Sequence, residues 1–347
     1  MTTNLKIKFR FSLLILIAGL LFASCDQQIS DSDQENGFFP RSNLESAREY
    51  SLKPNGESAL IIWHQGQLVL EEYTGQLNRS AKHTLFSGTK SLAGILAALA
   101  VRDNLFTFHT PLSELIDGWD PESERGSVTV RELLNLTSGI ETAPAGQFIG
   151  QSPGFWRNLQ MAYDKGTTFA YGPTPFYILA MIMIDKFGID PVQYLNENLF
   201  QPLGLAEPDW IFSVGSQNEI PNLSFGALYP AFDWVQLGIL LSNGGTLNGI
   251  SIIPTEIFSE LLNPSSAGPN YGITFWLNTP VGGTGQNSGR YISSNLPADA
   301  FMKSGLFGQR LYIVPSMELI IARFGPVGDS GYNDREFFRR LLNELEV

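Results

Sequence analysis

A serine and a lysine stand three residues apart at the start of an apolar segment. In Ser87-Gly88-Thr89-Lys90 this spacing places both side chains on one face of a helix, whose N-terminus adds partial positive charge where a reacting oxygen would become anionic. A serine hydroxyl is a poor nucleophile at neutral pH, but a lysine with a pKa lowered by apolar neighbours can accept its proton. The pair therefore predicts a nucleophile beside its base, although S-x-x-K alone occurs about once by chance in a chain of this length.

The segment that follows the lysine must be buried. At 92–101 almost every residue is small or aliphatic, so a helix there is apolar on all sides. Strand-like runs occur near both chain ends, at 59–63, 67–70, 271–277, 310–314 and 319–324. Between them, the region 100–262 has mostly helical patterns. We therefore predict an α+β fold: an α/β sandwich whose antiparallel sheet is built from both chain ends, with an all-α lobe inserted.

Composition excludes several functions. The 347 residues carry a net charge of −12, which disfavours nucleic-acid binding because phosphate contacts need a basic face. A single cysteine rules out an intramolecular disulfide. The three histidines, His64, His83 and His109, are too scattered for a plausible zinc site. We therefore expect no metal and no organic cofactor.

The N-terminal residues are typical of an export signal. Lys6, Lys8 and Arg10 precede an apolar stretch at 11–22, which is shorter than the ~20 residues needed to cross a bilayer. Its end, Leu21-Phe22-Ala23-Ser24-Cys25, looks like a bacterial lipoprotein cleavage site, with phenylalanine where leucine is usual. This resemblance implies that Cys25 is acylated and becomes the mature N-terminus.

The sequence predicts three segments along the chain. We predict a signal peptide at 1–24, an acidic flexible tether at 25–55 and a hydrolase domain at 56–347, because the residues after Cys25 are polar and lack aliphatic periodicity. The protein would be a lipid-anchored lipoprotein of the bacterial cell envelope, facing the periplasm or the cell exterior. Its membrane contact would be limited to the N-terminal lipid anchor.

Four motifs occur in a recognisable order. They are Ser87-Gly88-Thr89-Lys90, Leu133-Leu134-Asn135-Leu136-Thr137-Ser138-Gly139, Tyr171-Gly172-Pro173 and Lys303-Ser304-Gly305. S-x-x-K followed by a K-T-G-like element is a known set. Over residues 56–325 the chain resembles the serine β-lactamase and penicillin-binding-protein superfamily. It is most similar to the class C-like branch, with its family VIII-type esterases and 6-aminohexanoate-dimer hydrolases. The resemblance implies a β-lactamase/transpeptidase-like fold.

The resemblance assigns a role to each catalytic side chain. It implies that Ser87 is the acylated nucleophile and Lys90 is the base that takes its proton. Tyr171 matches the family tyrosine that serves as general base and leaving-group acid. Near two ammonium groups, Lys90 and Lys303, its pKa would be lowered. The alternative for Tyr171 is a plain core residue of an aromatic-rich lobe.

The resemblance also implies an oxyanion hole and a substrate-binding strand. The backbone N–H groups of Ser87 and Leu306 would stabilise the oxyanion, and Gly305 would lie at the sheet edge that lines the cleft. Lys303 and Ser304 would bind a substrate carboxylate. The alternative for this pair is a solvent-exposed strand end.

One departure from the family motif shapes the predicted substrate. Where the family has asparagine, this chain has Pro173, which offers neither a side-chain amide nor a backbone N–H to hold a substrate amide. We therefore predict a serine hydrolase that acts through an acyl-enzyme on esters or small amide and peptide-like substrates. A β-lactamase or D-alanyl-D-alanine carboxypeptidase is one alternative. A non-catalytic lipoprotein that binds cell-wall fragments or a partner is another.

A second serine motif fails on chemical grounds. Gly150-Gln151-Ser152-Pro153-Gly154 fits the G-x-S-x-G nucleophile elbow, but Pro153 lacks the N–H that an oxyanion hole needs, and no histidine follows. We interpret it as a loop. Four aromatic residues are candidates for the cleft wall or for plain core: Phe148, Phe155, Trp156 and Tyr163.

Overall fold

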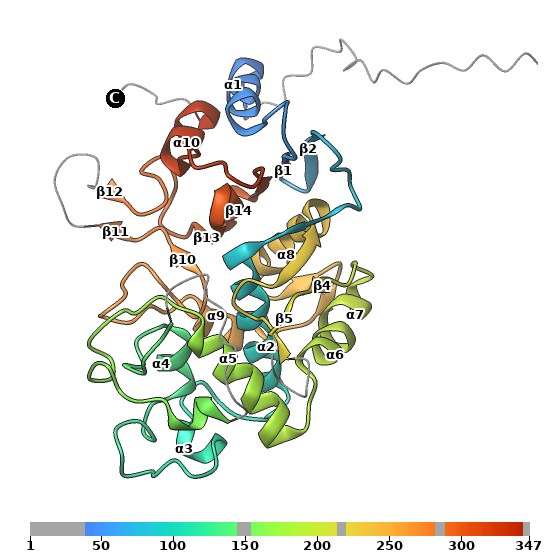
Figure 1. Ribbon diagram of the computed structural model, residues 1–347. Helices are drawn as coiled ribbons and strands as arrows, with labels where there is room; N and C mark the ends of the chain where they lie inside the picture. The colour runs from blue at the N-terminus through green and yellow to red at the C-terminus, as the bar shows by residue number, and fades with distance from the viewer. Residues whose placement is uncertain (1–38, 144–153, 214–219, 282–288, 343–347) are drawn as a thin grey trace, which may run out of the picture. The chain divides into compact units, whose positions relative to one another are not determined.

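The main sheet joins the two ends of the chain. The computed structural model describes residues 39–143, 154–213, 220–281 and 289–342. Within these ranges the main sheet is antiparallel, with the strand order β10-β13-β14-β15-β1-β2 (Figure 1). Its strands are β1 Ala59–His64, β2 Gln67–Tyr73, β10 Trp276–Leu277, β13 Phe301–Gly305, β14 Gln309–Val314 and β15 Leu319–Phe324. The predicted sheet, built from both chain ends, is confirmed.

The pleat of the sheet separates two hydrophobic clusters. Along β1, Leu60 and Ile62 face one side, and Ala59 and Ile61 face the other, since successive strand residues alternate. The two pairs pack into different clusters of buried residues. Both faces of the sheet are therefore apolar, and both must be covered by helices.

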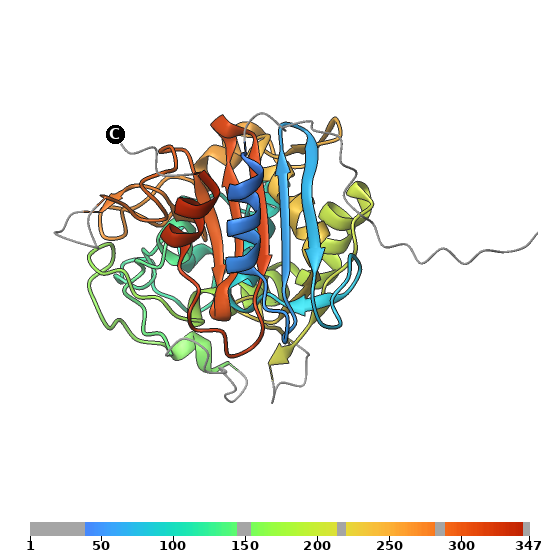
Figure 2. The ribbon, with the colours of Figure 1, turned by 90° about the horizontal axis from the view of Figure 1, so that it is seen from above.

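Helices cover both faces. Helix α1 (Arg41–Ser51) and helix α10 (Asp334–Leu342) pack against each other over one face, as Figure 2 shows from above. Helix α8 (Ala231–Ser242) packs against β1, β14 and β15 on the opposite face. Its close approach needs Gly238, because a Cβ there would lie 2.5 Å from Ile320 Cγ2. The result is the predicted α/β sandwich.

Helix α1 corrects the predicted tether at 25–55. Ala47 of this helix is fully buried, and Asn43 Nδ2 donates to the Leu341 carbonyl of α10 at 3.3 Å. Residues 41–51 are therefore part of the folded unit that spans Asn36–Val347. The segment is mostly polar, and packing against α10, which sequence periodicity does not reveal, stabilises its helical form.

The apolar segment forms a central buried helix, as predicted. Helix α2 (Lys90–Arg102) follows the short 3-10 helix η1 (Phe86–Thr89), and every residue from Lys90 to Ala100 is buried. At Gly94, a Cβ would lie 2.2 Å from Thr274 Oγ1. The glycine therefore permits a neighbouring segment to pack directly against the helix backbone.

Short helices and small sheets complete the inserted lobe. Its helical elements are α3 Leu112–Leu115, α4 Val130–Leu134, η2 Phe155–Asn158, α5 Thr174–Met181, η3 Ile182–Lys186, α6 Pro191–Leu195, η4 Asn196–Phe200, α7 Gln201–Leu203 and α9 Thr255–Leu261. Its short strands are β3 Lys82–Thr84, β4 Asp209–Trp210, β5 Phe212–Ser213, β6 Ile220–Pro221, β7 Ala227–Pro230, β8 Thr246–Leu247 and β9 Ile250–Ser251. Beyond the lobe, β11 Pro280–Val281 pairs with β12 Gly289–Arg290.

Two predicted elements are shorter than the sequence suggested. The helix expected at 128–139 is limited to α4, which begins with a capping box between Thr129 and Glu132 and is followed by Leu136 at φ +63°. The strand expected at 271–277 is limited to β10, because Thr274 has a φ of +68°. Left-handed backbone at a non-glycine residue interrupts regular structure in both places.

In the described ranges, no helix combines the length and apolar character that crossing a membrane requires. The same ranges hold no group of three or more His, Cys, Asp or Glu residues placed to bind a metal ion. The predicted signal peptide and Cys25 lie outside the described residues, as do Phe148, most of the rejected serine motif and the glycine-rich residues 282–288.

Candidate active site

The predicted nucleophile and base lie together. Ser87 belongs to η1, and Lys90 is the first residue of α2. Lys90 Nζ is 3.1 Å from Ser87 Oγ, within hydrogen-bond distance. Phe86, just before the serine, has a φ of +46°, a strained conformation of the kind that clusters at functional sites. The local turn therefore holds the serine oxygen against the lysine nitrogen.

Burial lowers the pKa of the Lys90 amine. Lys90 is 3% exposed, and this desolvation lowers its pKa to about 7, as the apolar sequence around it predicted. The rings of Tyr171 and Phe176 lie 4.9 and 5.1 Å from Nζ. At neutral pH a large share of the Lys90 side chains are therefore uncharged and able to accept a proton.

A backbone carbonyl orients this lysine. Lys90 Nζ donates to the Ser224 carbonyl at 2.7 Å. The turn that presents this carbonyl is held by Asn222 Oδ1, which accepts from the Ser224 N–H at 3.1 Å and from the Phe225 N–H at 3.2 Å. Sequence reasoning missed this contact, because a main-chain acceptor leaves no signature in residue type.

Tyr171 lies in the site, but its pKa shifts in the direction opposite to the prediction. Burial raises the pKa of its phenol, and a side-chain hydrogen bond with Ser87 only partly opposes this effect. The predicted lowering assumed two ammonium groups nearby. Burial, however, lowers the pKa of both Lys90 and Lys303 and so disfavours the charged lysines that the prediction assumed. Tyr171 therefore keeps its phenolic proton at neutral pH.

The residues after Tyr171 fix its position. A Cβ on Gly172 would lie 2.1 Å from Thr142 Oγ1 and 2.7 Å from the Ala143 carbonyl, so only glycine fits. Pro173 caps helix α5, and its carbonyl accepts from Phe176 N–H at 3.1 Å. At the position of the family asparagine, this chain thus has a structural helix start without a polar side chain.

The lysine of the third motif is buried. Lys303 in β13 is 1% exposed, so the alternative of a solvent-exposed strand end does not hold for it. Its Nζ lies 4.8 Å from the Phe275 ring centroid. Burial first, and then the charge of Lys90, lower its pKa well below the usual range. Burial therefore disfavours the charged form of Lys303 in the free protein.

Strand pleating separates Lys303 from Ser304. Consecutive side chains of β13 point to opposite faces of the sheet. Ser304 is half-buried and pairs across the ladder with Arg310, whose guanidinium binds Asp334 of α10. The structure therefore does not bring Lys303 and Ser304 together as the predicted joint carboxylate site.

The end of β13 abuts the nucleophile turn. A Cβ on Gly305 would lie 2.2 Å from the Leu85 carbonyl, so this contact requires glycine. One residue beyond Leu306, the ring of Phe307 packs edge to face on Phe86, with centroids 5.3 Å apart. The contacts on either side of Leu306 bring its backbone next to the segment that carries Ser87.

A stack of aromatic rings extends from Tyr171. The Trp276 ring stacks on Tyr171 with centroids 5.8 Å apart, and Tyr291 stacks on the other side of Trp276 at 5.0 Å. Sequence reasoning missed Trp276, because Tyr171 lies far from it along the chain. Two of the predicted wall aromatics are placed elsewhere: Trp156 is fully buried core, and Phe155 packs on Tyr177. Tyr163 is 50% exposed.

Comparisons with known proteins bear on the fold that carries this site. Residues 56–214 match the β-lactamase family model. Among solved structures, a β-lactamase candidate from Bacteroides dorei DSM 17855 has a TM-score of 0.68 at 15% identity, over 87% of this chain and 97% of that chain. A penicillin-binding-protein homologue from Caulobacter crescentus has a TM-score of 0.62 at 17% identity, over 87% and 95%.

A family VIII carboxylesterase has a TM-score of 0.64 at 14% identity, over 86% of this chain and 96% of that chain. No curated protein sequence matches the chain. Identities this low establish the fold and leave the substrate open. The family match at residues 56–214 and the shared architecture show that the chain has a β-lactamase/transpeptidase-like fold.

Proposed function

We propose that this protein is a serine hydrolase that forms an acyl-enzyme on Ser87 and acts on esters or small amides. One observation carries the proposal: a buried lysine with a pKa of about 7 lies 3.1 Å from a serine hydroxyl at the start of the central helix. A neutral amine in hydrogen-bond reach of a hydroxyl is the arrangement that activates a serine without histidine.

The chemistry can be followed atom by atom. Ser87 Oγ gives its proton to Lys90 Nζ and attacks the substrate carbonyl carbon, and the backbone N–H groups of Ser87 and Leu306 stabilise the resulting oxyanion. Tyr171 donates its phenolic proton to the departing alcohol or amine, and the Lys90 ammonium then reprotonates Tyr171. Water next transfers a proton to Lys90 and attacks the acyl carbon. Release of the acid returns the proton to Ser87.

Two features favour esters and small amides over β-lactams. Pro173 gives no side-chain amide to hold an acylamino group. Lys303 is buried with a lowered pKa, and the pleat directs Ser304 to the other face of the sheet, so the two side chains do not form a ready binding site for a substrate carboxylate. A carboxylesterase and a candidate 6-aminohexanoate-dimer hydrolase from Bacillus anthracis share the fold.

The test compares the purified protein with its Ser87→Ala variant. Both are exposed to a short-chain nitrophenyl ester, a chromogenic cephalosporin and a fluorophosphonate probe. We expect ester hydrolysis and one covalent adduct on the intact protein, both lost in the variant. Faster hydrolysis of the cephalosporin would overturn the preference for esters in favour of a β-lactamase. No adduct and no turnover would favour the non-catalytic, binding-protein alternative.

A further inference from the structure

The turn between β13 and β14 carries the Leu306 N–H of the proposed oxyanion hole. It comprises the 3-10 helix η6 (Leu306–Gly308) between Gly305 and Gln309. Phe307 within it has a φ of +60°, a strained conformation that local preference does not stabilise. The surrounding structure must therefore hold the turn in place.

One arginine binds the peptide group that carries this N–H. Arg310 Nη1 donates to the Gly305 carbonyl at 2.9 Å and to the Gln309 carbonyl at 3.0 Å. The Gly305 carbonyl and the Leu306 N–H belong to the same trans peptide, so they point in opposite directions. Fixing the carbonyl on Arg310 therefore aims the N–H away from the arginine.

A carboxylate keeps this arginine charged and in place. Arg310 Nε lies 2.7 Å from Asp334 Oδ1 at the start of α10. Burial alone would lower the pKa of Arg310, but the Asp334 carboxylate, together with Tyr312 and Tyr332, outweighs burial and raises it. A charged donor makes a stronger hydrogen bond than a neutral one, and it also polarises the peptide whose N–H must stabilise the oxyanion.

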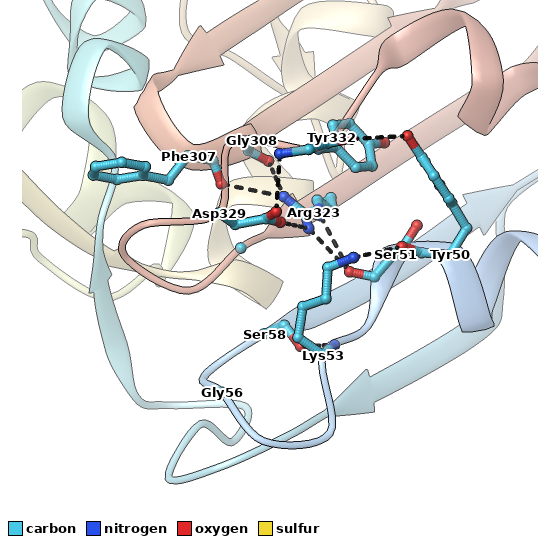
Figure 3. Close-up of polar contacts among 12 residues, drawn as sticks. Tyr50, Ser51, Lys53, Gly56, Ser58, Phe307, Gly308, Arg323, Asp329 and Tyr332 are labelled. Carbon is cyan, nitrogen blue, oxygen red and sulfur yellow. Dashed lines mark hydrogen bonds and ion pairs between the residues drawn. The ribbon is translucent and has the colours of Figure 1, made fainter.

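A second arginine holds the rest of the turn. Arg323 Nη1 donates to the carbonyls of Phe307 at 3.2 Å and Gly308 at 3.0 Å, and Nη2 binds Asp329 Oδ2 at 2.6 Å (Figure 3). Its side chain is 0% exposed. Nη2 also donates to the Ser51 carbonyl, the last residue of α1, at 3.1 Å. The guanidinium thus connects three segments that are distant in sequence.

The two arginines form one cluster. Arg310 and Arg323 are register partners on β14 and β15. The Tyr332 ring lies beside both, 5.8 Å from the Arg310 guanidinium carbon and 4.1 Å from that of Arg323. Gly308 leaves the necessary space, because its Cβ would lie 2.0 Å from Arg323 Nη1. Four of the five carbonyls between Gly305 and Gln309 therefore accept from a guanidinium.

Fold stability alone does not require this arrangement. Buried ion pairs are often no more stabilising than well-packed apolar residues of similar volume. The donors here converge on the carbonyls of one short turn, beside the nucleophile. Oxyanion-hole donors must be held rigidly, since removal of one donor costs about 10²- to 10³-fold in turnover.

We propose that Arg310 and Arg323 are positioning residues. By binding the carbonyls of the turn, on the side opposite the Leu306 N–H, they fix this N–H in the oxyanion hole. The inference rests on the proposed acyl-enzyme function. Arg310 acts directly on the peptide that carries the N–H, and Arg323 holds the remainder of the turn. Neither side chain touches the substrate.

The experiment compares Arg310→Met, Arg310→Lys and Arg323→Lys with Arg102→Gln in the full chain. Arg102 is the matched control: it also binds a carboxylate, Asp103 at 2.7 Å, and a carbonyl, Ile252 at 3.1 Å. It lies at the far end of α2, about 18 Å from Lys90 along the helix axis. Each variant is assayed with a nitrophenyl ester and with phenylboronic acid, which forms a tetrahedral adduct on serine. Melting temperatures are recorded alongside.

We expect Arg310→Met to lower kcat about 10- to 100-fold with KM changed less than about twofold, and to raise the boronic acid Ki by the same factor as kcat/KM falls. The two lysine variants should show a smaller fall in kcat, again with KM nearly unchanged. Arg102→Gln should change neither kcat nor Ki. If Arg310→Met does not fold, the kcat and Ki of Arg310→Lys test the proposal instead.

Folded arginine variants with unchanged kcat and unchanged Ki would overturn the proposal. So would a loss of kcat that leaves Ki unchanged, or a loss that Arg102→Gln reproduces. An intact protein that neither hydrolyses the ester nor labels at Ser87 would instead refute the proposed function, and the inference would fall with it. If the intact protein is active and the arginine variants have unchanged kcat and Ki, the inference about the arginines is refuted and the proposed function stands.

Discussion

At the scale of single residues, burial decides which group is acid and which is base. Lys90 and Tyr171 are both desolvated, but desolvation favours the neutral form of each. For the lysine that form is a free amine, which accepts a proton. For the tyrosine it is a phenol, which donates one. In the proposed function, one physical effect therefore prepares both partners for acyl transfer at neutral pH.

The pKa of Lys90 predicts the pH dependence of activity. The base works in its neutral form, so kcat/KM should fall about tenfold per pH unit below about pH 7 and level off above it. Tyr171 has a raised pKa, so its ionisation should cause no loss below pH 10. Ester hydrolysis measured from pH 5 to 10, with the folded state followed by circular dichroism, tests this. A profile that stays flat through pH 7 would contradict the role of Lys90.

Tyr171 should matter most for poor leaving groups. A nitrophenolate departs without a proton, whereas an alkyl alcohol or an amine needs one. Tyr171→Phe should therefore slow hydrolysis of an ethyl ester or anilide about 100-fold and of a nitrophenyl ester less than about tenfold.

Tyr271→Phe is the matched control, since Tyr271 is also buried and its ring lies 6.3 Å from that of Tyr171. We expect it to retain activity on all three substrates. Equal losses on good and poor leaving groups in Tyr171→Phe would show that the hydroxyl orients Ser87 and is not the leaving-group acid.

At the scale of elements, close packing positions the nucleophile. Helix α2 is apolar on all sides, and neighbouring segments reach its backbone through glycine. At Gly94 the contact is the side chain of Thr274, whose own φ is +68°. The start of α2, with Ser87 just before it, depends on this packing for its position relative to β13.

Gly94→Ala should destabilise the protein. The new Cβ would meet Thr274 Oγ1 at 2.2 Å, and overpacking of this kind costs about 1 to 3 kcal/mol. Denaturant unfolding measures the loss. Thr274→Gly removes both the clash and the left-handed strain, so the double variant should recover part of the stability. Additive effects of the two substitutions would mean that the helix shifts and Thr274 is not the obstacle.

The elements differ in how well the sequence predicts them. The α2 segment and strands β1, β14 and β15 follow from local apolar patterns, and the Ser87–Lys90 pair follows from helical spacing. Helix α1 could not be predicted this way, because packing against α10 stabilises it. The Ser224 carbonyl and the stacking of Trp276 on Tyr171 are contacts between distant segments. The pKa of Tyr171 was predicted wrongly because burial of the phenol, which the sequence does not reveal, raises it.

At the scale of the whole molecule, the predicted lipid anchor would place the hydrolase at a membrane surface. We propose that Cys25 is acylated after cleavage of the signal peptide, on the strength of the cleavage-site residues at 21–25. An anchored enzyme would meet its substrates near the membrane.

Cys25→Ser tests the anchor. We expect the intact protein to fractionate with membranes and to incorporate labelled palmitate, and the variant to lose both properties while retaining ester hydrolysis. Ser24→Ala keeps a small residue before the cysteine and should behave like the intact protein. Membrane association that survives Cys25→Ser would show that another part of the chain provides it.

The pairing of β1 with β15 also means that the sheet needs both ends of the chain. Ala59 lies opposite Phe324, so the first strand has no partner on this side until the last strand is available. Contacts so distant in sequence close late and slowly. A partly synthesised chain therefore cannot complete its sheet before β15 is available, and, if the protein is exported as proposed, this delay would favour passage through a secretion channel that needs an unfolded polypeptide.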